Sequence, residues 1–206
     1  TSEKPATRGR IWDLRIPRGL LLARGHVWAL LQASGRVRIG ADQLVLGALG
    51  GVDHIVPAKE GALVQRGDPF AVLWRNGHPI RLHAPVTGVV TSVNRALVHH
   101  PDRLYRRLYK PDGWLAEMEP EAIESELPLL RVGESAALWI RAEFERLRTL
   151  AADGFAHAVP AEARALADGG DLREGFLSDF ESEGWNLFEE RFLAEQAPNR
   201  TECEGR

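Results

Sequence analysis

The feature that most constrains the fold is an Asn-Gly pair, Asn76-Gly77, which separates two short stretches with strand character. Residues 70–75 precede the pair and residues 79–84 follow it. A two-residue type I′ turn needs positive φ at both central positions, and asparagine and glycine tolerate this best. The segment therefore predicts a tight antiparallel β-hairpin with Asn76-Gly77 at its tip.

The surrounding sequence also shows the short strands and frequent turns that are typical of a β protein. Further strand candidates lie at residues 27–32, 36–39 and 52–56. The apolar stretch 19–23 is placed to cover an edge of the sheet, and Asp42 is expected to cap one helical turn over 42–46. Turns are indicated at Glu60-Gly61, Arg66-Gly67-Asp68-Pro69 and Thr87-Gly88. Many short strands separated by glycine and proline favour a sandwich or a barrel.

From about Pro120 the spacing of apolar residues becomes helical. The first helical face comprises Ile140, Phe144, Leu147 and Ala151, and Asp153-Gly154 is a stop signal. Residues 160–167 are a candidate for a second, short helix. Two aromatic faces follow, separated by Gly184, which is expected to break the helix: Leu172, Phe176 and Phe180, then Trp185, Phe188 and Phe192.

These patterns divide the chain into four parts. We expect a basic N-terminal arm (1–25), a β domain (26–120), a helical extension (121–196) and a disordered tail (197–206). The predicted fold class is mainly β with α extensions.

The cysteine count and the length of the apolar runs limit the compartment in which the protein is expected. The single cysteine, Cys203, allows no internal disulfide, and no apolar run is long enough to span a membrane, so a cytoplasmic protein without a transmembrane segment is expected. The chain starts without a signal-peptide apolar region and without an initiator methionine, so upstream sequence could have been trimmed.

Charge is distributed unevenly along the chain. Residues 1–110 hold 17 Lys/Arg against 7 Asp/Glu, whereas residues 111–206 hold 9 against 22. Either the acidic part folds back on the basic part, or both faces are solvated, or a bipolar surface steers a charged partner. The basic residues are dispersed and an acidic arm would compete for them, so no nucleic-acid partner is expected.

Several motifs in register carry a resemblance to a known family. They are Gly25-His26-Val27-Trp28, Arg36-Val37-Arg38-Ile39-Gly40, Gly61 to Asp68, Leu82-His83-Ala84-Pro85-Val86-Thr87-Gly88, Val93-Asn94-Arg95-Ala96-Leu97 and Pro111-Asp112-Gly113-Trp114-Leu115. Over residues 25–120 the sequence resembles the biotinyl/lipoyl domain, and more specifically the H protein of the glycine cleavage system. The resemblance implies a lipoyl-domain, H-protein-like flattened β-barrel sandwich, here followed by C-terminal helices.

The resemblance also exposes a departure from the family pattern. In H proteins the hairpin tip carries a lipoylated lysine, and counting back from Ala84-Pro85 places that position at Gly77, within the tip Asn76-Gly77-His78. The lysines of this chain are Lys4, Lys59 and Lys110, all outside the hairpin. We therefore expect no lipoyl arm and no other cofactor. Arg75, His78 and Arg81 make the tip basic.

Other chemistry has little support in the sequence. The seven histidines (26, 54, 78, 83, 99, 100 and 157) show no tight ligand spacing, so surface or half-buried positions are expected and no metal site is predicted. Cys203 is interpreted as incidental, and the acidic run Glu117, Glu119, Glu121, Glu124 and Glu126 as a solvated face. No set of residues with catalytic roles can be assembled, so the chain is not expected to be an enzyme.

The sequence thus favours a non-enzymatic, lysine-less H-protein homologue that acts as a docking or scaffold subunit of a larger protein complex. An alternative is a regulator or decoy that binds glycine-cleavage or lipoate-handling enzymes. A third, weaker alternative is a small-molecule or metal-binding module that uses the His-bearing hairpin. Candidate partner-binding residues are Arg75, His78, Arg81, Phe176, Phe180, Trp185, Phe188 and Phe192; the aromatic members could instead dock on the protein's own barrel.

Overall fold

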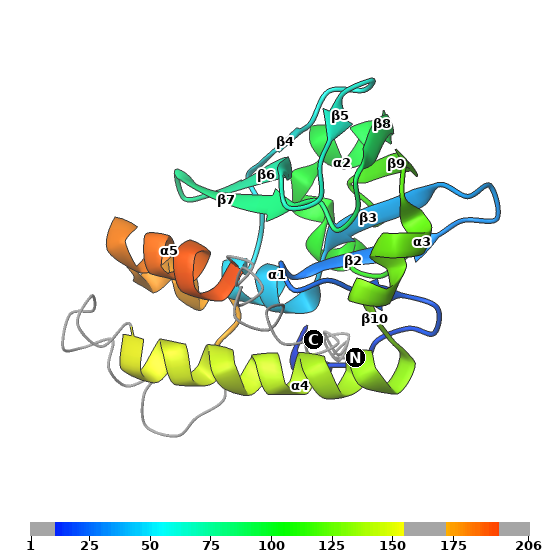
Figure 1. Ribbon diagram of the computed structural model, residues 1–206. Helices are drawn as coiled ribbons and strands as arrows, with labels where there is room; N and C mark the ends of the chain where they lie inside the picture. Colours follow the sequence, from blue (N-terminus) through cyan, green and yellow to red (C-terminus); the bar gives the residue numbers. More distant parts are fainter. Residues whose placement is uncertain (1–10, 155–171, 194–206) are drawn as a thin grey trace, which may run out of the picture.

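The computed structural model describes residues 11–154 and 172–193. Within these residues the strands form two antiparallel sheets, with the orders β10-β1-β2-β3-β9-β8-β5 and β4-β6-β7 (Figure 1). The larger sheet contains β1 (Leu21–Leu22), β2 (Val27–Leu31), β3 (Val37–Ala41), β5 (Leu63–Val64), β8 (Gly88–Val93), β9 (Ala116–Pro120) and β10 (Arg131–Val132). The smaller sheet contains β4 (His54–Pro57), β6 (Pro69–Arg75) and β7 (His78–His83). The prediction of a mainly β, lipoyl-domain-like fold with added helices is confirmed.

The central hairpin forms where the Asn-Gly pair predicts it. Arg75 pairs with His78, which leaves Asn76 and Gly77 as a two-residue turn. Their φ angles are 51° and 80°, the positive values that this turn requires. Local sequence is therefore sufficient to explain the position of the turn and the register beside it, from Arg75–His78 to Ala71–Leu82; the register shifts beyond that, between Pro69 and Ala71.

The first helix, α1 (Gln43–Leu49), begins at the predicted cap. One carboxylate oxygen of Asp42, Oδ1, accepts hydrogen bonds from the backbone N–H groups of Leu44 and Val45, at 2.8 and 3.2 Å. These two donors have no partner within the helix, so the cap satisfies them. The second oxygen of Asp42 remains available for another contact.

The larger sheet includes two strands outside residues 25–120, the range that the motifs cover. β1 lies in the apolar stretch expected to cover a sheet edge and pairs with β2 as a strand of the sheet. β10, which follows Pro120, then pairs with β1 and extends the same sheet, with Leu21 opposite Val132. The first part of the predicted helical extension is thus built into the β structure.

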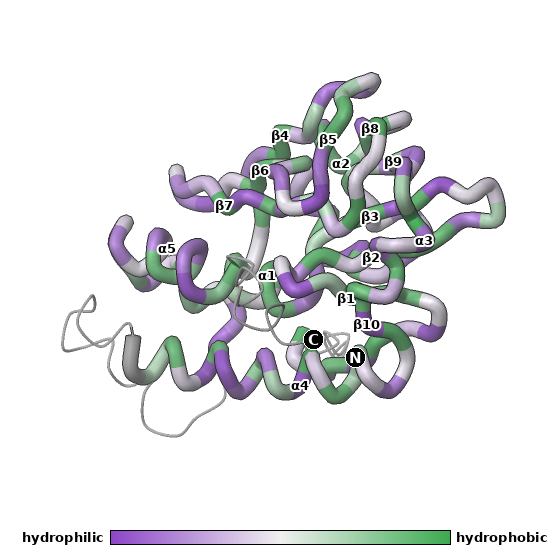
Figure 2. The backbone as a smooth tube through the Cα atoms, viewed as in Figure 1, coloured by the Kyte–Doolittle hydropathy of each residue, from purple (hydrophilic) through white to green (hydrophobic). Residues whose placement is uncertain are grey.

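The remaining helical segments surround the sheets. They are η1 (Ile11–Asp13), α2 (Arg95–His99), η2 (Pro101–Arg103), η3 (Tyr105–Arg107), α3 (Ile123–Glu126), η4 (Leu127–Leu129), α4 (Gly133–Thr149), the π-helical turn η5 (Leu150–Gly154), η7 (Phe176–Asp179), α5 (Ser182–Phe188) and the π-helical turn η8 (Glu189–Leu193). α4 buries Ile140, Phe144 and Leu147, the face predicted from their spacing. Hydrophobic and hydrophilic residues alternate along α4 and α5 in Figure 2, as expected of helices with one buried face.

The extension packs against the β domain rather than apart from it. In Figure 1, α5 lies between the β6–β7 hairpin and α4. The backbone N–H of Gly175 donates to the carbonyl of Gly47 in α1 at 2.7 Å, which ties the start of η7 to that helix. The buried apolar residues of both parts form a single cluster.

One predicted helix break is wrong. Gly184 lies inside α5, and a Cβ atom there would approach the Cβ of Phe180 to 2.6 Å. Glycine at this position therefore permits close packing of the helix on Phe180 and does not end the helix. The predicted helix at 160–167 and the predicted tail at 197–206 lie outside the described residues.

A glycine substitution tests how tightly β8 and β9 pack. A Cβ atom on Gly88 would lie 2.3 Å from the carbonyl oxygen of Glu119, so Gly88→Ala is expected to lower the free energy of unfolding by about 1–3 kcal/mol. Gly25→Ala is the matched control, because its Cβ would meet nothing closer than 3.9 Å. Urea unfolding followed by tryptophan fluorescence compares the two variants, and equal midpoints would contradict the packing described here.

Candidate functional site

The β6–β7 hairpin is the part of the structure that corresponds to the predicted tip. Asn76 and Gly77 are exposed, and nothing lies within 4 Å of the position that a Cβ atom on Gly77 would take. In the described part of the chain, β7 is an outer strand of the smaller sheet. The candidate site is therefore an exposed two-residue tip on an edge strand, and its chemistry depends on what lies beside it.

Arg75, the first of the predicted basic residues, is paired within the β domain. Its Nη1 lies 2.8 Å from Oδ1 of Asp53, whose other oxygen accepts the backbone N–H of Asn76 at 2.8 Å. Desolvation opposes ionisation of Asp53, but the hydrogen bonds from Asn76 and Arg75 outweigh it, and the pKa of Asp53 is lowered. Asp53 therefore neutralises one side of the tip and anchors its backbone.

Arg81 is bound by the extension. The carboxylate of Glu189 in η8 accepts the backbone N–H of Arg81 at 3.0 Å, and Nη1 of the same residue lies 3.0 Å from each carboxylate oxygen. The backbone bond occupies a donor on the outer edge of β7, where another strand would otherwise pair. Glu189 thus neutralises the arginine and covers part of the strand edge.

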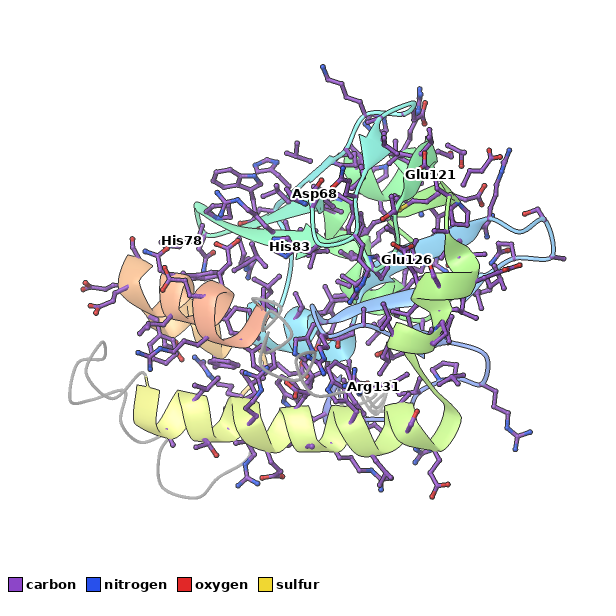
Figure 3. The ribbon with its side chains drawn as sticks, viewed as in Figure 1. Asp68, His78, His83, Glu121, Glu126 and Arg131 are labelled. Carbon is purple, nitrogen blue, oxygen red and sulfur yellow. The ribbon has the colours of Figure 1, made fainter. Side chains whose placement is uncertain are left out.

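The tip and its second basic residue also contact the extension. The imidazole of His78 stacks on Trp185 of α5, with ring centroids 4.7 Å apart and an interplanar angle of 12°. The side-chain amide of Asn76 donates to the hydroxyl of Ser178 in η7 at 3.0 Å. Figure 3 labels His78 and His83 at the two ends of β7, with His78 next to α5. The structure therefore brings Arg75, His78 and Arg81 together, but each has a partner within the chain.

The aromatic residues offered as a partner-binding face lie inside the protein. Their exposed fractions are 1% for Phe176, 9% for Phe180, 2% for Trp185, 0% for Phe188 and 1% for Phe192. Burial of this kind supports the alternative interpretation, docking of the extension on the protein's own domain. These five side chains are therefore part of the protein's own core in this structure.

The turn after the hairpin involves a residue that sequence reasoning assigned to solvent. The carboxylate of Glu126 accepts hydrogen bonds from the backbone N–H and the hydroxyl of Thr87, at 2.8 and 2.7 Å. Thr87 lies in the Ala-Pro-Val-Thr-Gly segment of the family motif. Glu126 is therefore a structural anchor within the acidic run. Its spacing in the sequence gave no signal of this role, because 39 residues separate the partners.

The described residues contain no group of three or more His, Cys, Asp or Glu side chains that could hold a metal ion. None of their helices is both long enough and apolar enough to cross a bilayer. Lys59 and Lys110 are exposed and lie outside the hairpin. Lys4, His157 and Cys203 are outside the described residues.

Two antiparallel sheets with a tight hairpin between a Gly-Asp turn and an Ala-Pro turn define a lipoyl-type domain. The chain belongs to the glycine cleavage H-protein family, whose model matches residues 20–141. That range is longer at both ends than the 25–120 over which the motifs carry the resemblance, in keeping with the presence of β1 and β10 in the larger sheet. H proteins are lipoyl carriers and not catalysts.

The matches to individual relatives cover most of the length of each relative. A probable glycine cleavage system H protein of Thermococcus kodakarensis is 27% identical over 131 residues, which are 64% of this chain and 96% of the relative. Glycine cleavage system H protein 2 of Pseudomonas syringae pv. tomato is 31% identical over 115 residues, 56% of this chain and 88% of the relative. A crystal structure of an H protein from Mycobacterium marinum has 25% identity and a TM-score of 0.48, and covers 58% of this chain and 90% of that chain.

The Arg81–Glu189 contact is testable by a double-mutant cycle. Glu189 is mostly buried, and the backbone N–H of residue 81, which an alanine variant keeps, holds its carboxylate in position. Arg81→Ala and Glu189→Ala are therefore expected to show a side-chain coupling energy of about 1 kcal/mol, at the upper end for partly exposed pairs. The Arg148–Glu145 pair on the exposed side of α4 is the control, with about 0.3–0.5 kcal/mol expected. A coupling no greater than that of the control would show that the Arg81 side chain adds nothing to the attachment of Glu189 to β7.

Proposed function

We propose that this chain is a non-enzymatic, lysine-less member of the H-protein family that serves as a docking or scaffold subunit of a larger protein complex. The observation that carries the proposal is the hairpin tip. Asn76-Gly77 stands where the family pattern has its lipoylated lysine. Asp53 and Ser178 hold Asn76 of the turn, and Glu189 holds Arg81 on β7. A tip without an amine offers nothing to acylate, and a tip fixed on both sides is suited to a static role.

The proposal assigns different tasks to the parts of the chain. The family domain supplies the surface for partners, and the helical extension closes over one side of the hairpin. Contact with a partner through the exposed tip and the exposed portions of Arg75, His78 and Arg81 remains part of the proposal. The buried aromatic residues contribute by fixing the extension. A cytoplasmic location is part of the same proposal, since the single cysteine would stay reduced there.

A second candidate function is supported by the preserved hairpin. The geometry of its turn and the turns around it are those expected of the family. A protein that recognises the shape of H proteins could therefore bind this hairpin. The chain would then act as a regulator or decoy for glycine-cleavage or lipoate-handling enzymes. The covered edge of β7 favours the scaffold role, because a partner that needs that edge would have to displace Glu189.

The absence of a lipoyl arm is tested by enzymatic loading. Incubation of the purified protein with lipoate–protein ligase, lipoate and ATP is expected to leave its intact mass unchanged. Gly77→Lys is expected to gain a lipoyl group, since there is room for a side chain at that position, although its φ of +80° is strained for lysine. Gly61→Lys, with φ +85° and equal room in another loop, is the matched control and should remain unmodified. A lipoyl increment on the wild-type chain, at Lys59 or Lys110, would contradict the proposal.

The identity of the partner separates the two candidate functions. A tagged chain isolated from its source cell at low salt is expected to bring down an unrelated complex at near-equal stoichiometry. Arg81→Ala should weaken this association if the hairpin takes part, whereas Arg148→Ala on α4 serves as the control. Recovery of glycine-cleavage or lipoate-handling enzymes would instead support the regulator, and a chain that remains alone under these conditions would contradict both.

A further inference from the structure

A fully buried histidine lies at the junction of the β domain and the extension. His26 is 0% exposed and sits in the turn between β1 and β2, where its φ is 58°. Its backbone carbonyl accepts the N–H of Asp42 at 2.9 Å, which fixes the turn next to the start of α1. The expectation of surface or half-buried histidines is wrong for this residue.

Both ring nitrogens of His26 face carboxylates. Nδ1 lies 2.9 Å from Oδ2 of Asp42, whose other oxygen caps α1, and Nε2 lies 3.4 Å from Oε2 of Glu143 on α4. Asp42 is 0% exposed and the Glu143 side chain 16%. The Nε2–Glu143 contact is at ion-pair distance and is not a hydrogen bond in this geometry. Because a neutral imidazole has only one N–H group, only the imidazolium form presents an N–H group to each carboxylate.

The same ring touches the end of the extension. The imidazole stacks on Phe192 of η8, with centroids 4.2 Å apart and planes 11° apart, and more loosely on Trp139 of α4 at 5.2 Å. The guanidinium of Arg146 lies 4.6 Å from the centre of the Phe192 ring and donates to the backbone carbonyls of Arg191 and Phe192, at 2.8 and 3.0 Å. Two cationic groups thus converge on Phe192, an arrangement that the electron-rich face of a ring stabilises.

A charge balance links these contacts. Arg146 Nε also bonds Glu143 at 2.8 Å, so His26, Asp42, Glu143 and Arg146, here called the His26 cluster, are neutral overall only when His26 is protonated. Burial opposes the charge on His26, but the attraction of the Asp42 and Glu143 carboxylates and the hydrogen bond of Asp42 outweigh it, and the pKa of His26 is raised. Loss of the proton would leave two carboxylates, one of them fully buried, against a single guanidinium.

The other titratable and charged groups around the cluster come from neighbouring elements. The guanidinium of Arg131 in β10 lies 4.9 Å from the centre of the Trp139 ring, and Figure 3 shows Arg131 next to α4. Burial and the charge of Arg24 lower the pKa of Arg131, whereas the charge of Glu143 acts to raise it. Burial and the charge of Asp42 raise the pKa of Tyr109 well above its ordinary value, so its hydroxyl stays neutral near pH 7. The side chain of His83, on β7, reaches the vicinity of Gly25. Among these groups, His26 is the one enclosed by two carboxylates.

We propose that His26 is a protonation-dependent clasp: as an imidazolium it ties α4 and η8 to the β domain through Glu143 and Phe192, and on losing its proton it loosens that attachment. The proposal does not depend on the partner or on the scaffold role. Because η8 also bears Glu189, loosening would free the edge of β7 and the side chain of Arg81. The clasp would therefore connect pH to the exposure of the hairpin.

The direction of the effect follows from the raised pKa. The stabilisation from the imidazolium is fully present below the unfolded value, about pH 6.5, and is lost as pH rises through the higher folded value. For each unit by which the pKa in the attached state exceeds that in the loosened state, the opening equilibrium changes about tenfold across this window.

The first test measures the wild-type protein. Imidazole ¹H–¹⁵N spectra between pH 5 and 9 are expected to show His26 losing its proton above the ordinary histidine value of about 6.5. Amide hydrogen exchange, corrected for the intrinsic effect of pH, should show η8 and the adjacent part of α4 opening more at high pH, with β6 as the internal reference. A His26 that is neutral at pH 6, or equal protection of η8 at both ends of the range, would overturn the proposal.

Variants separate the clasp from general destabilisation. His26→Gln should lose protection of η8 at pH 6 and show no further loss at high pH, whereas His99→Gln at an exposed position should behave like wild type. If His26→Gln does not fold, Glu143→Gln provides the second variant: removal of one carboxylate should move the opening transition to lower pH. A Glu143→Gln transition at the wild-type pH would contradict the role of Glu143 in the clasp.

Discussion

Burial of the aromatic face of the extension against the β domain is the interaction on which the rest of the structure depends. Phe176, Phe188 and Phe192 are essentially inaccessible to solvent, and each such side chain contributes roughly 1.5–3 kcal/mol when it is removed from water. This packing brings η7, α5 and η8 beside the hairpin. The hydrogen bonds of Ser178 and Glu189 and the stacking of Trp185 on His78 are consequences of that placement.

The same placement changes the surroundings of the hairpin, because the extension pairs one of its charges and covers part of one strand edge. In a lipoyl-type domain, a tight turn projecting from the sheet suits the presentation of a carrier group, and the turn geometry is retained here. Its flanking charges, however, are compensated by Asp53 and Glu189, and one strand edge is partly covered. The hairpin is thus an attachment point for residues 176–193 of the extension, an arrangement that supports the docking role proposed above.

Much of the β domain was predictable because its determinants are local. The Asn-Gly turn, the Asp42 cap and the helical spacing of Ile140, Phe144 and Leu147 each act within a few residues, and each has the expected conformation. Gly184 was misassigned because a glycine required for close packing on Phe180 has the same sequence signature as a helix break. Glu126 was misassigned because hydrogen bonding to Thr87 leaves no periodic trace.

The sequence by itself determined the turn and the hairpin around it, the family and the absence of a lysine at the tip, since these depend on residue type and short-range spacing. The tertiary structure alone decided that the aromatic residues are core and that Arg81 is neutralised. It also decided that His26 lies between two carboxylates. These contacts connect residues that are far apart in the sequence. His26 is 16 positions from Asp42 and 117 positions from Glu143, and Arg81 is 108 positions from Glu189. Contacts at such separations are set by the packing of whole elements, and no local pattern encodes them.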